Sequence, residues 1–262
     1  MNPLFQRLSL ITGKEVIDAL LHTHVFVFGV GGVGSWCAEA LVRSGVGSIT
    51  LVDSDLVCVT NINRQVQATM HTVGAVKVEA LKTRLLEINP HGVIEAKAVV
   101  FSKERASDFD FVPSDYIIDA IDSLGNKLDL IELALKAGST LYSSMGMAQK
   151  LDPTQIRTAD IWESSNCALA RLVRQGLRKR GFTRHFTVVY SPEKLPLHRE
   201  IEIACGSGAC LCPNPCGEAA RTEWCSSKKV INGSAVMVTA AAGMILASLV
   251  VQDIYRKQGV QQ

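Results

Sequence analysis

Polar and charged residues with the composition of a phosphate-binding site lie between positions 53 and 122. Arg64 and Lys77 can hold phosphate oxygens, and a carboxylate such as Asp122 can hold Mg²⁺ together with substrate phosphates. Attack of a substrate carboxylate on an α-phosphate would then release pyrophosphate, because cationic groups would stabilise the developing charge. Taken singly, each residue also suits a surface or helix-capping role. The residues that we expect at strand ends are Asp53, Asp55, Asn61, Asn63, Arg64, Gln65, Lys77, Asp119 and Asp122.

A glycine-rich segment precedes these residues and is expected to organise them. Residues 25–28 form an unbroken apolar run, which predicts a strand buried on both faces, and residues 36–42 predict a helix. Between them lies Gly29-Val30-Gly31-Gly32-Val33-Gly34. Residues 49–52 predict a second buried strand that ends at Asp53, about 20 residues after the glycines. This order is the dinucleotide-binding pattern of strand, glycine turn, helix, strand and acid.

Each part of this pattern has a physical reason. Gly29 permits the tight turn, Gly31 lets the backbone approach a phosphate, and Gly34 lets the helix pack closely on the strand. The helix N-terminus offers unpaired N–H groups to that phosphate, and Asp53 can accept hydrogen bonds from ribose hydroxyls. NAD, FAD and ATP all fit the pattern, and so does a glycine turn that only packs a helix on a sheet. No histidine or tyrosine is evident for the proton relay of a dehydrogenase, so the polar residues favour phosphate chemistry.

Strands and helices alternate from residue 25 to residue 146, which predicts an α/β, Rossmann-like fold with a mainly parallel twisted sheet and helices on both faces. We divide the chain into an N-terminal arm (1–24), a nucleotide-binding core (25–150) and a substrate or dimer region (151–262). The arm is expected to be helical over 4–22 with a break at Gly13. The other expected elements are helices over 76–88, 128–136, 168–180 and 233–251, strands over 93–100, 116–118, 139–143 and 185–190, and a cysteine-rich loop over 200–228.

Composition favours a globular enzyme of the cytoplasm. The 262 residues are 47% hydrophobic and 20% charged, which suits a chain that buries a sizeable core. The N-terminal sequence MNPLFQRLSL lacks the apolar core of a secretory signal. Eight cysteines without such a signal argue for a reducing compartment. The net charge of +2 is too small to indicate a nucleic-acid partner by itself.

The segment 233–251 is apolar, carries no charge and is long enough to span a bilayer. Its alanines, Thr239, Gly243 and Ser248 are small residues that also suit close packing against a sheet. Nothing else in the sequence indicates a membrane protein. We therefore favour a buried helix, with membrane association through 233–251 as the alternative.

The loop 200–228 contains five closely spaced cysteines, which are Cys205, Cys210, Cys212, Cys216 and Cys225. The loop is poor in apolar residues, so a tetrahedral Zn²⁺ held by four thiolates would supply folding energy. The spacing is not a paired C-x₂-C, and reduced thiols or redox disulfides stay open as alternatives. Cys37 and Cys58 are expected to be small apolar fillers of the core.

The motifs resemble those of the ubiquitin-activating-enzyme-like adenylyltransferases, the HesA/MoeB/ThiF superfamily. The resemblance rests on Asp53-x-Asp55, Asn61-x-Asn63-Arg64-Gln65, Val73-Gly74-x-x-Lys77 and Asp119-Ala120-Ile121-Asp122. Within the superfamily, the sequence is most similar to the tRNA threonylcarbamoyladenosine dehydratases. That similarity lies in Phe5-x-Arg7, Gly13-Lys14-Glu15, Cys58-Val59-Thr60-Asn61, Lys150-x-Asp152-Pro153-Thr154 and the apolar C-terminal helix. It spans nearly the whole chain and implies one ThiF-type adenylating domain.

This resemblance implies a homodimer that uses ATP and Mg²⁺ to activate the carboxylate of the threonylcarbamoyl group on a tRNA adenosine. Loss of AMP would then close a ring in a net dehydration. By the same resemblance, Gly31 would contact the nucleotide and Asp53 the ribose, while Asp122 would hold Mg²⁺. Asn61, Arg64 and Lys77 would grip the phosphates. Arg7 matches an arginine that reaches into the site of the partner subunit, and a sulfur-relay protein is a further implied partner.

A basic helix supports tRNA as the substrate. Such a patch grips phosphate backbones without reading sequence, although a solvated helix face has the same composition. The patch consists of Arg171, Arg174, Arg178, Lys179 and Arg180, followed by Arg184 and His185. Two other functions stay open: adenylation of the C-terminus of a ubiquitin-like sulfur-carrier protein, and a nucleotide-binding sensor without turnover. Pyrophosphate release with each substrate would separate the three.

Overall fold

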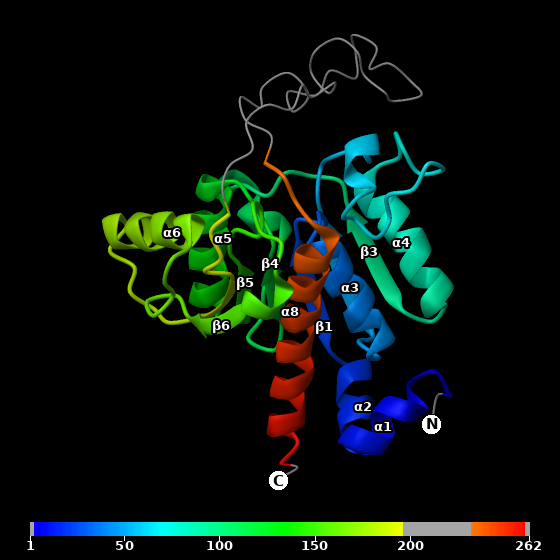
Figure 1. Cartoon of the computed structure of the whole chain (residues 1–262). Helices are drawn as coiled ribbons and strands as arrows, with labels where there is room; N and C mark the ends of the chain where they lie inside the picture. The colour runs from blue at the N-terminus through cyan, green and yellow to red at the C-terminus, as the bar shows by residue number, and fades with distance from the viewer. Residues whose placement is uncertain (1–2, 196–231, 260–262) are drawn as a thin grey trace.

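A seven-stranded sheet forms the centre of the protein, with the strand order β3-β2-β1-β4-β5-β7-β6 (Figure 1). The computed structural model describes residues 3–195 and 232–259. All neighbouring strands are parallel except β6 and β7, which are antiparallel. The predicted α/β, Rossmann-like fold is therefore confirmed. The strands are β1 (His24–Phe28), β2 (Ser48–Val52), β3 (Val93–Lys97), β4 (Tyr116–Asp119), β5 (Thr140–Ser144), β6 (Arg157–Asp160) and β7 (Thr187–Tyr190).

Apolar residues on both faces explain why the central strands form. Val27 of β1 pairs with Leu51 of β2 and with Ile118 of β4, and all three side chains are fully buried. Such strands appear in a sequence as continuous apolar runs. The sequence analysis missed β6, because its polar residues lie half exposed at the edge of the sheet and form no apolar run. β3 is also shorter than predicted, since it ends at Lys97.

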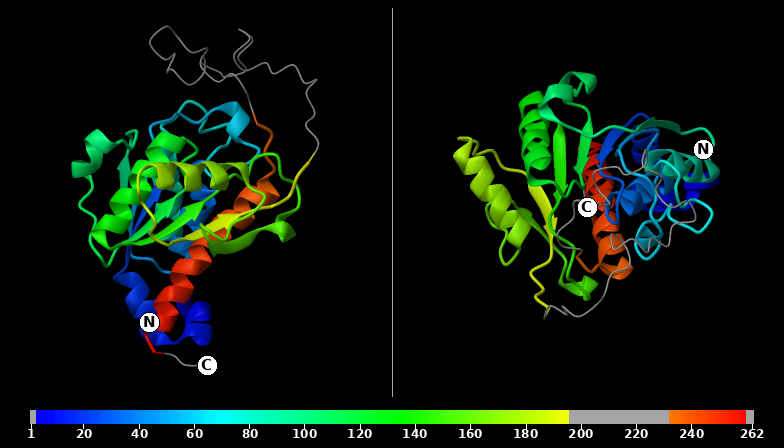
Figure 2. Two further views of the ribbon diagram at one scale, coloured as in Figure 1. Left: turned by 90° about the vertical axis from the view of Figure 1, so that its left-hand side faces the viewer. Right: turned by 90° about the horizontal axis from the view of Figure 1, so that it is seen from above.

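Helices cover both faces of the sheet, as predicted. One face carries α2 (Lys14–Leu21), α3 (Gly34–Arg43), α4 (Lys77–Ile88) and α8 (Val236–Lys257), which share a hydrophobic cluster with β1 and β2. The other face carries α5 (Leu124–Ala137) and α6 (Ala168–Lys179), which pack around Phe28 and its neighbours. Figure 2 shows the sheet between these two layers. The other helical segments are α1 (Gln6–Thr12) and the 3₁₀ turns η1 (Pro3–Phe5), η2 (Val59–Asn61), η3 (Lys103–Asp108) and η4 (Pro153–Gln155).

The apolar segment expected at 233–251 forms α8, which begins at Val236 and continues to Lys257. Among the described residues, α8 is the one helix that is long and apolar enough to cross a bilayer, and 44% of its most apolar stretch is buried within the protein. Ala242 and Leu246 lie on its buried face, and Gly243 lies against the first turn of α3. This packing supports a buried helix, while membrane association stays an untested alternative.

The N-terminal arm is helical and breaks at Gly13, as predicted. Because α2 leads directly into β1, the arm lies at the amino ends of the parallel strands (Figure 1). Phe5 packs against Gly45, just beyond the C-terminal end of α3. Leu10 and Ile11 of α1 are 82% and 79% exposed. The arm therefore presents apolar side chains to its surroundings at this end of the sheet.

Candidate nucleotide-binding site

The glycine turn lies at the carboxyl end of β1, and its backbone leaves no room for side chains. Gly29 has a φ of +83°, and a Cβ there would lie 2.7 Å from the carbonyl oxygen of Ala120. A Cβ on Gly34 would lie 1.9 Å from the carbonyl oxygen of Gly29. Since α3 begins at Gly34, the N-terminus of the helix lies at this bend. Within the bend, the backbone N–H of Ser35 donates to the carbonyl oxygen of Gly31 at 3.2 Å. The turn thus has the geometry that the sequence pattern predicts for phosphate binding.

Asp53 ties the second strand to the glycine turn. Its carboxylate accepts hydrogen bonds from the backbone N–H of Val30 and of Asp55, each at 2.9 Å. Burial raises the pKa of Asp53, and the positive charge of Lys77 partly opposes this effect. A carboxylate fixed in this way keeps lone pairs for further donors, because each oxygen accepts more than one hydrogen bond. Asp53 is therefore placed to receive ribose hydroxyls beside the turn.

An ion pair between Lys77 and Asp55 lies next to Asp53. Lys77 Nζ is 2.7 Å from Asp55 Oδ2, and the two side chains are 7% and 31% exposed. The backbone N–H of Lys77 also donates to the carbonyl oxygen of Asp55, so the base of the intervening loop is closed. Lys77 begins α4, and its ammonium group has a half-exposed carboxylate as its partner. A phosphate group at this edge could replace Asp55 as the partner of the Lys77 ammonium group, since a phosphate carries more negative charge than one carboxylate.

Arg64 lies over the glycine turn. Trp36 of α3 donates from Nε1 to the carbonyl oxygen of Arg64 at 3.0 Å, which fixes the loop backbone. The guanidinium group donates to the carbonyl oxygen of Thr60 and to Asn63 Oδ1, and its side chain lies beside Gly32. Burial lowers the pKa of Arg64, and the negative charge of Asp122 opposes the shift. Asp122 is exposed in the short loop between β4 and α5.

The amide side chains of the polar loop organise it, and all of them except the exposed Asn63 are buried. Asn61 Oδ1 accepts a hydrogen bond from the backbone N–H of Cys58 at 3.0 Å. Asn63 Nδ2 donates to the carbonyl oxygen of Ser234, which joins the loop to the start of α8. Gln65 is buried with its amide near Gly31. Gln67, which the sequence analysis did not single out, donates to the carbonyl oxygen of Val30 at 2.9 Å. These contacts hold the loop against the glycine turn.

Asp119 does not project into the site, and this corrects the sequence-based prediction. Its side chain is fully buried, with Oδ2 2.7 Å from Lys127 Nζ and 2.6 Å from Ser143 Oγ, while Oδ1 accepts from the backbone N–H of Ile121. It therefore supports the loop that carries Asp122. One signal in the sequence could have revealed this role, because Lys127 shares the helical spacing of buried Ile131 and Ala134 and so occupies a core position.

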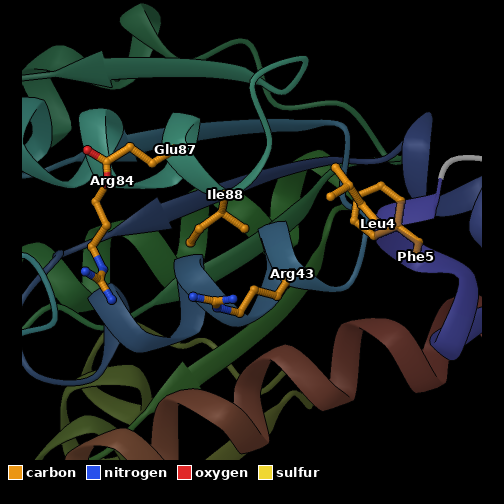
Figure 3. Close-up of a pocket in the computed structure, with 6 residues that line it drawn as sticks. All are labelled: Leu4, Phe5, Arg43, Arg84, Glu87 and Ile88. Carbon is orange, nitrogen blue, oxygen red and sulfur yellow. The ribbon is translucent and has the colours of Figure 1, made fainter.

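Arg7 lies at the opposite end of the sheet from these residues. It is exposed on α1. A hollow of about 450 Å³ lies between the arm and the helices α3 and α4, and Arg7 does not line it (Figure 3). Arg43 and Arg84 in this hollow hold the buried carboxylate of Glu39, at 2.9 and 2.6 Å. Because these cations already neutralise a buried acid, we assign the hollow no ligand. The residues that line it are Leu4, Phe5, Arg43, Arg84, Glu87 and Ile88.

The metal-binding predictions stay predictions. No group of three His, Cys, Asp or Glu side chains suited to a metal ion occurs among residues 3–195 and 232–259. The zinc prediction lies outside those residues, since it rests on Cys205, Cys210, Cys212, Cys216 and Cys225. Cys37 is a buried core residue, as expected, and burial raises its pKa. Cys58 is not, because it is half exposed and lies 3.1 Å from Thr60 Oγ1.

Comparisons with known proteins show the family to which the chain belongs. The model of the ThiF family matches residues 5–258. A tRNA threonylcarbamoyladenosine dehydratase of Bacillus subtilis is 43% identical over 196 residues, which cover 75% of this chain and 77% of that protein. Its counterpart in Haemophilus influenzae is 35% identical over 249 residues, or 93% and 90% of the two chains. The crystal structure of the E. coli enzyme in complex with ATP gives a TM-score of 0.81 at 29% identity and covers 98% and 96%.

The family match includes the arm, the glycine turn, the polar loop and α8. The two relatives that carry the dehydratase name align over most of their own lengths. On these grounds the chain belongs to the ThiF family and, within it, to the tRNA threonylcarbamoyladenosine dehydratases.

Proposed function

We propose that this protein uses ATP to dehydrate N6-threonylcarbamoyladenosine in tRNA, by adenylating the carboxylate and closing a ring. The observation that carries the proposal is the convergence of the glycine turn, Asp53, Lys77 and Arg64 at one edge of the sheet. Relatives at 35–43% identity bear the name of this activity, and the E. coli relative has been crystallised with ATP. Adenylation of a sulfur-carrier protein is the less favoured alternative.

Two steps account for the reaction. A carboxylate oxygen of the substrate attacks the α-phosphorus, the bond to the bridging oxygen of the β-phosphate breaks, and pyrophosphate leaves. A urea nitrogen or the urea oxygen of the threonylcarbamoyl group then attacks the activated carbonyl carbon, and in either case a urea N–H group loses its proton. AMP departs with the oxygen that would otherwise be lost as water. Neither step needs a cysteine nucleophile.

The residues of the site have distinct parts in the first step. The glycine turn and the first turn of α3 present N–H groups to the phosphates, while Asp53 binds the ribose. Arg64 and Lys77 hold the triphosphate and stabilise the charge that develops on pyrophosphate. Lys77 would exchange its contact with Asp55 for one with a phosphate oxygen. Because Asp55 is half exposed, it can be rehydrated after this exchange.

Asp122 fits a role in holding Mg²⁺. It is exposed in the loop that follows β4, at the same edge of the sheet as the glycine turn. Mg²⁺ is commonly held by one or two carboxylates together with substrate phosphates, so a lone aspartate is sufficient on the protein side. The ion would neutralise phosphate charge when bound there.

Nucleoside analysis of tRNA tests the proposal directly. tRNA that carries N6-threonylcarbamoyladenosine is incubated with the protein, ATP and Mg²⁺, then digested and separated by mass. We expect a product lighter by one water, together with stoichiometric pyrophosphate. Pyrophosphate release that requires a carrier protein ending in two glycines would support the alternative. No release with either substrate would contradict both and favour a nucleotide sensor.

We also propose a homodimer in which Arg7 completes the site of the partner subunit. Within one chain, Arg7 lies at the amino edge of the sheet and the glycine turn at the carboxyl edge, so the two cannot meet. Exposed Leu10 and Ile11 follow Arg7 on α1. Apolar side chains that are this exposed are typical of a surface that a second copy covers.

Subunit mixing tests the shared site. Arg7→Ala and Asp122→Ala should each be inactive as homodimers. Mixing them after partial unfolding should restore roughly a quarter of the wild-type activity, because half of the dimers would then contain one intact site. Mixing two preparations of Asp122→Ala is the control. Absence of any rescue, in mixtures shown to contain heterodimers, would contradict the shared site.

A further inference from the structure

The helix α6 and the residue after it carry five basic residues and no acid. These residues are Arg171, Arg174, Arg178, Lys179 and Arg180. Their availability to a partner cannot be judged from sequence, since an arginine that is bound within the fold offers little charge to a ligand. The contacts of each side chain therefore decide which of them can act outside the protein.

Two of the arginines are engaged within the fold. Arg174 donates to the carbonyl oxygens of Ile161 and Ser164, at 3.2 and 2.8 Å, and so caps the preceding turn. Arg180 forms ion pairs with Asp129 and Glu132 of α5, at 2.6 and 3.1 Å. The two basic residues that follow are also engaged. Arg184 donates to the carbonyl oxygen of Leu135, and His185 lies 3.1 Å from Asp160.

The other basic residues of α6 point outward. Arg171 and Lys179 are exposed and form no ion pair with any residue that the structure describes. Arg178 is also exposed, and its guanidinium group lies 5.2 Å from the centre of the Trp162 ring. An arginine placed over an aromatic ring keeps N–H groups available to a second partner. These three residues are called the α6 basic face below.

The helix α6 starts at the same edge of the sheet as the proposed active site. Ala170, Val173 and Leu177 are the buried side of the helix, so Arg171 and Lys179, two turns apart, lie on the opposite side, about 12 Å from each other. Leu169 packs against Gly146, which follows the carboxyl end of β5. That end belongs to the same sheet edge as the glycine turn and Asp122. The basic face therefore extends outward from that edge.

We propose that Arg171, Arg178 and Lys179 dock the phosphate backbone of the substrate tRNA while its modified adenosine occupies the site at the sheet edge. This inference rests on the proposed function, because it assigns the surface that receives the same substrate. Three positive charges without neighbouring acids on the helix match a polyanion. Contacts of this kind orient the nucleic acid and raise its affinity without reading its sequence.

The test compares the double variant Arg171→Gln/Lys179→Gln with the wild type and with Lys103→Gln/Arg105→Gln. The control pair removes two equally exposed charges from η3, which also packs on α5. Binding of modified tRNA is followed by fluorescence anisotropy at several salt concentrations, and turnover by pyrophosphate release. Thermal unfolding of each variant confirms that the fold is intact.

We expect the α6 double variant to weaken tRNA binding on the order of tenfold, with a rise in KM for tRNA and little change in kcat or in KM for ATP. The slope of log Kd against log salt should fall by roughly 1.5 to 2, because about two phosphate contacts are lost. The control pair should behave as wild type. Equal losses in both pairs, or wild-type binding by the α6 variant, would overturn the inference. A wild-type protein that turns over no modified tRNA would instead overturn the proposed function.

Discussion

Two lysine–aspartate pairs flank the glycine turn, and they differ in burial rather than in length. In the first pair, Asp55 follows β2 and binds Lys77. In the second pair, Asp119 is the last residue of β4 and binds Lys127. Both pairs have an N–O distance of 2.7 Å. The side chains of the β4 pair are completely buried, whereas Asp55 of the β2 pair is 31% exposed. A buried pair cannot exchange partners without leaving a charge in a medium of low polarity. A pair that reaches water can do so at little cost.

The two pairs have the same chemistry at equivalent strand ends but different roles. The buried pair supports the fold, whereas the pair that reaches water can serve in binding. Asp119 accepts hydrogen bonds from Lys127, Ser143 and the backbone of Ile121, so nothing in its surroundings is left for a ligand to displace. Lys77 has one carboxylate partner and lies beside the turn where phosphates are expected. The same substitution, lysine to methionine, should therefore reduce stability at Lys127 and turnover at Lys77.

Lys127→Met is expected to have the largest effect, and on stability. Removing the ammonium group leaves the Asp119 carboxylate buried and uncompensated, which costs about 3–5 kcal/mol of unfolding free energy. Chemical denaturation followed by circular dichroism measures the loss. Adding Asp119→Asn to this variant removes the remaining charge and should recover part of the stability. A loss below about 1 kcal/mol would show that the pair does not support the fold.

Lys77→Met should leave stability within about 1 kcal/mol of the wild type, because its partner is solvated. We expect turnover to fall about a hundredfold, since a cation that stabilises the developing phosphate charge is lost. Steady-state pyrophosphate release measures the change. If Lys77→Met unfolded as readily as Lys127→Met, the division between a functional and a structural pair would be wrong.

The smallest effect concerns the pH dependence at Asp53. Burial raises the pKa of Asp53, so the carboxylate takes up a proton at higher pH than an ordinary aspartate. Since the folded state holds that proton more tightly than the unfolded state, this group contributes stability at low pH that is lost as pH rises through its folded pKa. ATP binding should change in the opposite direction, because a protonated Asp53 is a weaker acceptor for ribose hydroxyls. Calorimetric titration of ATP over acidic pH should show weaker binding in the wild type and a flatter profile in Asp53→Asn.

Sequence patterns predicted the first half of the fold closely, because its central strands are buried on both faces of the sheet. β1, β2 and β4 each form an apolar run, and α3 follows the glycines directly. β6 was missed because a short polar edge strand has no such run. α8 continued past the expected end because charged residues of its last turns, such as Asp253 and Lys257, still pair with each other and with Tyr116.

The site was predicted in composition but not in its internal organisation. Asp53 and Lys77 lie where the motifs placed them. The supporting contacts of Trp36 and Gln67 had no sequence signal, since both bond to backbone carbonyl groups of distant residues. Asp119 was misassigned because its partner Lys127 lies on a helix face that the motif does not include.

The sequence by itself determined the fold class, the glycine turn and the family, because these depend on local periodicity and on short motifs with fixed spacing. Only the tertiary structure decided which charged side chains are free to act. Burial and distance between residues far apart in the chain separate Lys77 from Lys127, and Arg171 from Arg174 and Arg180. The energy of a charge depends on its surroundings, and packing creates those surroundings.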